Sequence, residues 1–216
     1  MLKRSSDGYR TNWSGRRGNN YKRSRYGDDG RGYRRHAFLP VFEPSGLLSL
    51  ESNSRNQVAL KHVEPSDSVS PEVHYTRWKV PLRRRTRFEA LLYRKGSQEG
   101  GSGNDEVQER WELSSAASYI IGSTITKSDK SENAAVVTDI GIPEETISEQ
   151  HAVIQFRERD GGALVPYVID LNSSNGTLLN GSVIPQARYV ELRSGDVLEF
   201  SNNSNDTNFE LIFMAV

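Results

Sequence analysis

The sequence predicts an all-β fold, a β-sandwich of about ten short strands that follows two N-terminal segments without regular structure. Three observations lead to this prediction. From about residue 86 onwards, short apolar runs alternate with turns of Gly, Asn, Asp, Ser and Pro. No apolar pattern of helical period extends over a useful length in that part of the chain. The first 35 residues, by contrast, are rich in Arg, Gly, Ser and Asn, a composition that buries too little apolar surface to fold.

Residues 1–35 form a basic arm. They contain eleven Lys or Arg and three Asp residues, a net charge of +8, with Tyr and Trp interspersed. Residues 96–216 carry seven basic and nineteen acidic residues, so the neutral chain combines a basic arm with an acidic body. Guanidinium and aromatic groups in an unfolded segment bind nucleic acid through phosphate charge and base stacking. We expect RNA contact through the arm, with a nuclear-import signal or a solvated tail as the alternatives; the arginines concerned are Arg16, Arg17, Arg23 and Arg25.

Residues 36–75 form a second segment, in which four prolines prevent any long helix or strand. Apolar side chains nevertheless gather between residues 38 and 50. Such a cluster outside a domain is typical of a linear motif that folds onto a partner protein. The sequence favours this interpretation, with Phe42, Leu47 and Leu48 as the binding residues, over packing of the segment on its own domain. A basic linker, residues 76–86, leads to the β domain expected over residues 87–216.

The turn residues divide the β domain into strands. The Gly- and Ser-rich stretch 96–104 is expected to be a flexible loop, and it lacks the Lys-Ser/Thr ending of a phosphate-binding loop. The expected strands are residues 87–94, 118–122, 136–140, 151–156, 166–171, 177–179, 182–184, 189–192, 196–200 and 208–214.

The composition excludes several classes of function. The chain contains no cysteine, which rules out disulfides, a thiolate nucleophile and Cys-based zinc sites, and no other metal or cofactor is indicated. No stretch approaches the roughly 18 apolar residues of a membrane span. The charged start of the chain is not followed by the apolar core of a secretory signal. We therefore expect a cytosolic or nuclear protein without membrane contact.

One candidate site begins where a loop enters the expected strand at residue 151. Ser148 and His151 lie three residues apart there and could form a nucleophilic pair. No orienting acid and no G-x-S-x-G turn accompanies them, so a Ser/His hydrolase is a weak alternative. A hydroxyl at a loop rim and a buried histidine at a strand start explain the pair equally well.

The second candidate is the stretch DLNSSNGTLLNG, residues 170–181. Its two Asn-Gly pairs, 175–176 and 180–181, are each typical of a tight turn with positive φ. Turn formation explains the glycines. It does not explain why Ser148, Ser173, Ser174 and Asn175 would gather at one rim of the sandwich.

The order of these motifs resembles that of the forkhead-associated (FHA) domain family, over about residues 87–216. The resemblance rests on the glycine at 122, the Ser-x-x-His motif at 148–151, and Asn-Gly-Thr at 175–177. FHA domains bind phosphothreonine peptides, so the resemblance implies a phosphopeptide-binding rim. It implies ligand contacts by Ser148, Ser174 and Asn175, and structural support by Gly122, His151 and Gly176.

One rim position departs from the FHA pattern. Ser123 stands where the family has an arginine that pairs with phosphate. A hydroxyl does not replace a guanidinium against a dianion, because charge-assisted bidentate contacts are the strong ones. Glu149 adds unfavourable charge, and Lys127 is a candidate for a compensating cation. We therefore expect little phosphothreonine preference at a rim made of Ser123, Ser148, Ser174 and Asn175.

Longer stretches resemble one family of FHA proteins, the subunits of nuclear pre-mRNA retention-and-splicing (RES) complexes found in fungi and animals. The likeness includes DIGIPEETISEQHAVIQF at 139–156 and FEPSGLLSLESN at 42–53, and spans about residues 38–216. It implies a non-enzymatic nuclear subunit whose linear motif binds the small RNA-recognition-motif (RRM) subunit, alongside other spliceosomal proteins. The alternative is an active phosphothreonine-peptide reader in nuclear signalling.

Overall fold

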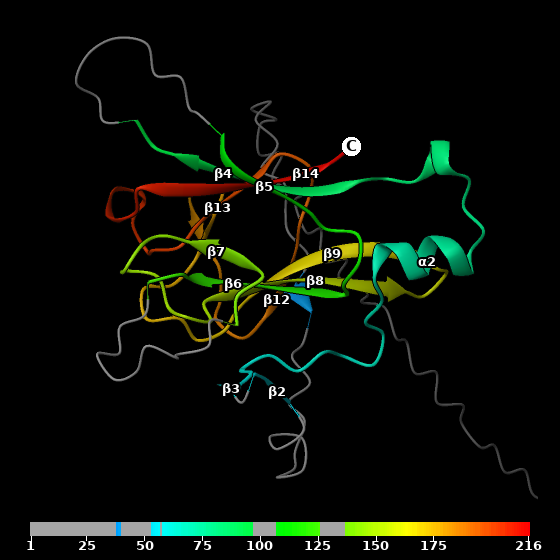
Figure 1. Cartoon of the computed structure of the whole chain (residues 1–216), viewed down its shortest axis with the longest axis horizontal. Coiled ribbons are helices and arrows are strands. Elements are labelled where there is room, and N and C mark those ends of the chain that lie inside the picture. The colour runs from blue at the N-terminus through cyan, green and yellow to red at the C-terminus, as the bar shows by residue number, and fades with distance from the viewer. Residues whose placement is uncertain (1–37, 40–52, 57, 97–106, 126–136) are drawn as a thin grey trace, which may run out of the picture. The chain divides into compact units, whose positions relative to one another are not determined.

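The computed structural model describes residues 38–39, 53–56, 58–96, 107–125 and 137–216. The basic arm, the expected motif residues Phe42, Leu47 and Leu48, and Lys127 lie outside these ranges. The described residues belong to one compact unit, residues 35–216. Two six-stranded sheets are stacked in this unit (Figure 1), which confirms the expected β-sandwich.

The first sheet has the strand order β1-β12-β9-β8-β6-β7. Its pairs are antiparallel apart from β6 with β7, which run parallel. The long hairpin of β8 and β9 forms its centre, with Ala152 opposite Asp170 and Arg159 opposite Ala163. The bounds are β1 Phe38–Leu39, β6 Ser118–Ser123, β7 Ile140–Ile142, β8 Ala152–Arg159, β9 Ala163–Asp170 and β12 Tyr189–Glu191.

The second sheet has the order β11-β10-β13-β14-β4-β5 and is antiparallel throughout. Strand β5 forms one of its edges, and five of its six residues are exposed. The bounds are β4 Phe88–Arg94, β5 Val107–Glu112, β10 Leu178–Leu179, β11 Ser182–Val183, β13 Asp196–Glu199 and β14 Phe209–Ala215.

The main core lies between the two sheets. Strand β4 shows how the sequence produces it, because Phe88, Ala90 and Leu92 alternate inward along the strand and are buried. The Phe88 ring lies 4.9 Å from the Phe156 ring and 6.0 Å from the Phe213 ring, measured between centroids. These contacts join strands of both sheets, so they hold the sandwich together.

A second apolar cluster lies on the outer face of the first sheet and includes Val153, Tyr167 and Tyr189. The chain from residue 58 to 70 covers this face. Leu60 packs against the cluster, and Arg157 Nε and Nη2 donate to the two Asp67 carboxylate oxygens, each at 2.8 Å. Where the structure describes it, the segment expected to be a linear motif therefore contacts the domain of its own chain, through β1, through Arg55 and through residues 58–70. Within this segment, the short strands β2 (Ser54–Arg55) and β3 (Val58–Ala59) pair with each other in a separate sheet.

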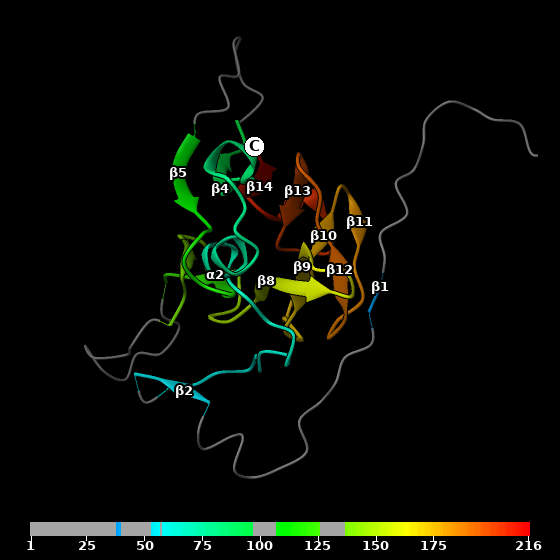
Figure 2. The same cartoon turned by 90° about the vertical axis from the view of Figure 1, so that its right-hand side faces the viewer.

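Helix α2, Pro71–Arg77, was not expected from the sequence, since proline suggested an irregular segment. Proline is compatible with the first turn of a helix, where its missing N–H needs no partner, and Ser70 caps the helix by accepting a hydrogen bond from Val73 N at 3.3 Å. The helix lies at one end of the sandwich (Figures 1 and 2). The short 3₁₀ helix η1, Leu82–Arg84, follows and leads into β4.

Two strand predictions need correction. The strand expected at 136–140 is wrong, because β7 covers Ile140–Ile142 and residues 137–139 lie outside any strand. Strand β5 was missed, because its solvent-facing sequence VQERWE carries little apolar signal. Most of the expected loop 96–104 lies outside the described residues.

Candidate functional site at the loop end of the sandwich

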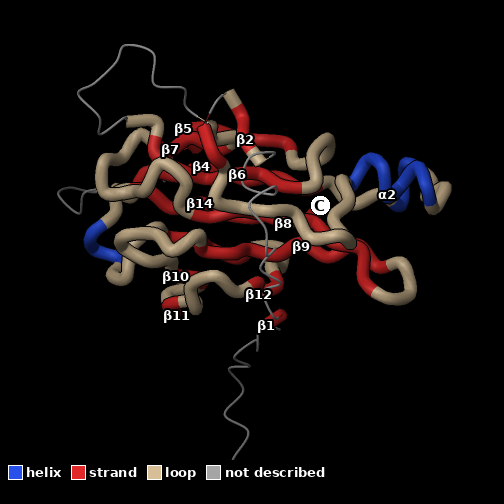
Figure 3. The backbone as a smooth tube through the Cα atoms, turned by 90° about the horizontal axis from the view of Figure 1, so that it is seen from below, coloured by secondary structure: helices blue, strands red, loops and turns tan. Residues whose placement is uncertain are grey.

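The residues of the expected rim come together at the end of the sandwich away from α2. The loops after β7, β9 and β13 meet there, and Figure 3 shows β7, β10 and β11 at the opposite end from α2. Residues 143–151, 171–177 and 200–208 make up these loops. We call this surface the rim.

Gly122 allows the β7–β8 loop to lie directly on β6. A Cβ atom at this position would lie 2.0 Å from the carbonyl oxygen of Glu149, a distance that no side chain can occupy. The close approach is fixed by backbone hydrogen bonds from Ser123 N to Ser148 O at 3.0 Å and from His151 N to Ile121 O at 2.9 Å. Glycine is therefore required here to position the Ser148 turn.

His151 is completely buried and holds two rim loops together from inside. Its Nδ1 accepts a hydrogen bond from Ser148 N at 3.2 Å, and its Nε2 donates to the Gly176 carbonyl at 2.9 Å. Its ring also meets the edge of the Phe200 ring, 5.2 Å away between centroids. Because both ring nitrogens bond to backbone groups, the geometry provides no general base for the Ser148 hydroxyl and argues against the hydrolase alternative.

Asp170 organises the turn that follows β9, a role that the sequence analysis missed. Its carboxylate is fully buried and accepts hydrogen bonds from Ser173 N at 2.8 Å, Ser173 Oγ at 2.6 Å and Thr177 Oγ1 at 2.6 Å. Both hydroxyls are also buried. The available signal was an aspartate opening a Ser- and Asn-rich turn, since such side chains commonly bond to backbone N–H groups nearby.

The supported turn presents Ser174 and Asn175 at the surface. Ser174 is exposed, and its N–H donates to Ser148 Oγ at 3.2 Å. Asn175 Nδ2 donates to the Thr146 carbonyl at 2.7 Å. Gly176 has a φ of +73°, and a Cβ there would meet the Asn202 side chain at 2.1 Å. Ser148, Ser174 and Asn175 thus lie together, as the resemblance to FHA domains implies.

The second Asn-Gly pair has a different role. Asn180 and Gly181 have φ values of +52° and +75° and form the tight turn between β10 and β11. Asn180 also bonds across to Asp196 Oδ1 at 2.9 Å and accepts from Val197 N at 2.9 Å. The stretch 170–181 therefore contains one turn that shapes the rim and one hairpin turn that shapes the sheet.

Ser123 lies behind the rim rather than on it. It is only 3% exposed. Its hydroxyl donates to the Glu144 carbonyl at 2.7 Å and accepts from Ile125 N at 3.0 Å. The residue expected to contact a ligand in place of the family arginine is thus engaged by the protein itself.

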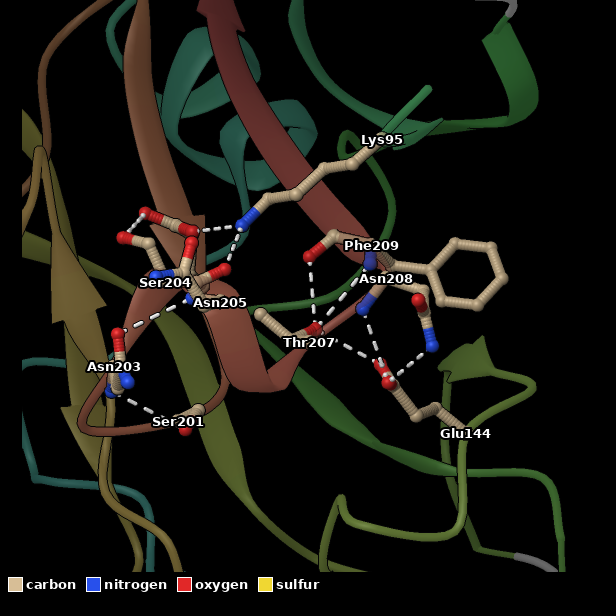
Figure 4. Close-up of polar contacts among 10 residues, drawn as sticks. Lys95, Glu144, Ser201, Asn203, Ser204, Asn205, Thr207, Asn208 and Phe209 are labelled. Carbon is tan, nitrogen blue, oxygen red and sulfur yellow. Dashed lines mark hydrogen bonds and ion pairs between the residues drawn. The ribbon is translucent and has the colours of Figure 1, made fainter. Parts of the chain in front are cut away.

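Glu144 links this position to the β13–β14 loop, which contains the 3₁₀ helix η2, Ser204–Asp206. Figure 4 shows its carboxylate accepting from Thr207 Oγ1 at 2.8 Å and from Asn208 N and Nδ2 at 3.0 and 3.1 Å. In the same view, Lys95 Nζ forms an ion pair with Glu199 and donates to the Ser204 carbonyl at 2.7 Å. Lys95, which contacts this loop, is therefore already paired.

The rim loops carry negative charge. Residues 143–151, 171–177 and 200–208 contain no Lys or Arg, whereas Glu145 and Glu149 are exposed. A phosphate at Ser148 and Ser174 would therefore meet neutral donors and nearby carboxylates. Over the described ranges, no group of His, Asp or Glu side chains is placed to hold a metal ion, and no helix is long and apolar enough to cross a membrane.

The sandwich and its loops define the class of protein, since residues 119–201 match the FHA domain. Pre-mRNA leakage protein 1 of Saccharomyces cerevisiae is 46% identical over 209 residues, covering 93% of this chain and 98% of that protein. The chain therefore belongs to the pre-mRNA leakage protein 1 family. Smad nuclear-interacting protein 1 of Mus musculus is 30% identical over 176 residues, covering 77% of this chain and 37% of that protein.

Two solved structures of the yeast protein have the same fold. The crystal structure of full-length yeast Pml1p matches with a TM-score of 0.62 and 46% identity, over 72% of this chain and 99% of that chain. A structure described as the yeast Pml1 splicing factor and its integration into the RES complex matches with a TM-score of 0.61 and 47% identity, over 73% of this chain and 99% of that chain. The family and the FHA-type fold that the sequence indicated are thus confirmed.

Proposed function

We propose that this chain is a non-enzymatic subunit of a nuclear pre-mRNA retention and splicing complex. The observation that carries the proposal is the 46% identity to yeast pre-mRNA leakage protein 1 over 98% of that protein's length. A match of this extent covers the N-terminal segments as well as the FHA domain. The yeast relative is described as a splicing factor integrated into the RES complex, and we assign the corresponding role to this chain.

In this proposal, the segment with Phe42, Leu47 and Leu48 binds the small RRM subunit of the complex. These residues lie in the sequence between β1, which pairs with β12, and β2. The segment is thus attached to the sandwich on both sides, because Arg55 forms an ion pair with Asp139 at 2.7 Å. Large apolar side chains in a short docking segment typically contribute about 2 kcal/mol or more each when buried.

The FHA rim serves in this proposal as a protein-interaction surface with little phosphate selectivity. The buried Ser123 and the lack of basic residues in the three rim loops support this view. The basic arm, through Arg16, Arg17, Arg23 and Arg25, is assigned to RNA or to neighbouring spliceosomal proteins.

The test is co-purification with the intact chain. The double substitution Leu47→Ala with Leu48→Ala should abolish recovery of the RRM subunit and leave the thermal unfolding of the sandwich unchanged. A matched control is Val107→Ala with Val183→Ala, which truncates two exposed apolar side chains of the sandwich. Retention of the RRM subunit by the Leu47/Leu48 variant would show that the motif assignment is wrong.

A further inference from the structure

The end of the sandwich opposite the rim carries a concentrated positive charge. Residues 77–87 run from the end of α2 through η1 to the start of β4 and contain six basic residues and no acidic one. Lys79, Arg83, Arg84 and Arg87 are exposed, and their side chains form no ion pair with any other residue that the structure describes. These four charges therefore take no part in ion pairs within the described part of the domain.

A groove of about 720 Å³ lies beside these residues. Figure 2 looks onto this end of the sandwich, with α2 in front. Leu82 lies at the edge of the groove and is 80% exposed although it is apolar. The groove is lined by Glu72 and Tyr75 of α2, by Leu82, Arg83 and Arg85 at η1, and by Glu112 at the end of β5.

Local hydrogen bonds hold the chain around the groove in one conformation. Arg85 Nε donates to the Val80 carbonyl at 2.9 Å, and its guanidinium lies 5.9 Å from the centre of the Tyr75 ring. The Tyr75 hydroxyl donates to the Thr86 carbonyl at 3.0 Å. Together with the turn of η1, these contacts fix the backbone that carries the arginines on a folded surface.

Trp78 adds an aromatic surface next to Arg77 and Lys79. Its Nε1 donates to Glu158 Oε2 at 3.1 Å, and its ring packs over Gly162, where a Cβ would come within 2.4 Å. The side chain is thus anchored, yet 52% of the residue's surface remains open to solvent. An anchored aromatic ring beside cations is the combination on which unpaired bases stack.

We propose that this surface, residues 71–87 with the groove beside them, binds single-stranded RNA. Five of the six basic residues between 77 and 87 are arginines, whose planar forks match phosphate geometry. In this arrangement, the backbone phosphates lie along Arg83, Arg84 and Arg87, and bases enter the groove or stack on Trp78. The proposal rests on the proposed function, because a chain in a splicing complex meets pre-mRNA.

The groove favours RNA over an acidic protein segment. Glu72 and Glu112 line it together with the arginines, and both carboxylates would repel acidic side chains. The same carboxylates accept hydrogen bonds from the exocyclic amino groups of bases. A polyanion whose charge lies on its backbone and whose hydrogen-bond donors lie on its bases therefore fits the groove better than a run of Asp and Glu.

The experiment measures RNA binding by the full chain, with the arm's net charge halved from +8 to +4. In a background of Arg16→Gln, Arg17→Gln, Arg23→Gln and Arg25→Gln, binding of a short fluorescent cytidine oligonucleotide, whose bases carry exocyclic amino groups, is followed by anisotropy as a function of salt. We expect measurable binding that the further changes Arg83→Glu, Arg84→Glu and Arg87→Glu weaken about tenfold or more. Three lost phosphate contacts should also reduce the slope of log K against log salt by about 2.

The matched control is Lys61→Glu, Arg94→Glu and Arg188→Glu, which changes the net charge equally at exposed residues elsewhere. Equal RNA binding by the two triple variants would overturn the proposal. Loss of all RNA binding when only the four arm arginines are replaced would also overturn it. Poly-glutamate that competes as well as RNA at equal charge would instead indicate an acidic protein partner. Recovery of the RRM subunit should be unchanged in the Arg83/Arg84/Arg87 variant, so failure of this proposal and failure of the proposed function are distinguishable.

Discussion

Replacing Ser123 with arginine should give this FHA domain a preference for phosphothreonine that we do not expect of the natural chain. In the present rim, a phosphate would meet the hydroxyl of Ser148, the exposed Ser174 and the amide of Asn175, with Glu149 exposed nearby. All three ligands are neutral. A guanidinium at 123 would add a charge-assisted contact of about 1.5–3 kcal/mol, which corresponds to about one to two decades of affinity.

The same substitution should lower the stability of the domain. Ser123 Oγ donates to the Glu144 carbonyl at 2.7 Å and accepts from Ile125 N at 3.0 Å, and both hydrogen bonds are lost when the hydroxyl is removed. Each contributes about 0.5–1.5 kcal/mol net, so the free energy of unfolding should fall by about 1–3 kcal/mol. Ser123→Ala loses the same bonds without gaining a charge and is the matched control.

Calorimetric titration of one phosphothreonine peptide and its unphosphorylated twin measures the phosphate preference of each variant. We expect no preference in the natural chain or in Ser123→Ala, and a preference of about tenfold or more in Ser123→Arg. Low-micromolar, phosphate-dependent binding by the natural chain would refute the reasoning and point to a cation outside the described residues, with Lys127 first. A folded Ser123→Arg protein without any preference would show that the rim geometry does not hold a phosphate.

Three further substitutions test the supports of the fold and the rim. Asp170→Ala leaves the buried hydroxyls of Ser173 and Thr177 without their acceptor and should lower the free energy of unfolding in urea by about 3 kcal/mol or more, whereas a loss below about 1 kcal/mol would contradict its role. Gly122→Ala should cost about 1–3 kcal/mol because its Cβ meets backbone, while Gly96→Ala, with open space around it, should cost little. Burial lowers the pKa of His62 below 6.5, so its contribution to stability is present above pH 6.5 and is lost as pH falls below it; His62→Gln should flatten that part of the stability–pH profile.

The fold was largely predictable because it is built from local signals. Alternating apolar residues and turn residues indicate β4, β8, β9 and β14 directly. Strand β5 is a strand only because it pairs with β4 at the sheet edge, and helix α2 depends on how Pro71 is placed within its first turn. Neither pairing nor helix position can be derived from composition.

The packing of residues 58–70 on the first sheet is reflected in the burial of strand β8. Strand β8 is buried without interruption from Ala152 to Arg157. A continuous buried run indicates a strand that is covered on both faces, and the second sheet can cover only one of them. The other face required a cover, which the chain from Val58 onwards supplies through Leu60.

The motifs of the rim could be predicted from the sequence, whereas the directions of its side chains could not. Ser148, His151 and Asn175 are fixed in order by the chain, and the fold brings them together. The inward position of Ser123 depends on the carbonyl of Glu144, 21 residues away, and on the loop that carries it. Which way a short polar side chain points is decided by such nonlocal partners, so the sequence alone gave its type and not its role.

The fold gives a meaning to a charge distribution that the neutral total conceals. The three rim loops contain acidic but no basic residues, whereas residues 77–87 contain six basic and no acidic ones, and the two sets lie at opposite ends of one sandwich (Figure 3). Charges separated in this way orient a molecule in the field of a polyanion, because the basic end is attracted and the acidic end is repelled. If the α2–η1 end binds RNA as proposed, the rim is directed away from the nucleic acid and towards protein neighbours. The serine at position 123 is consistent with this orientation, since a cation there would make the rim compete for the same polyanion.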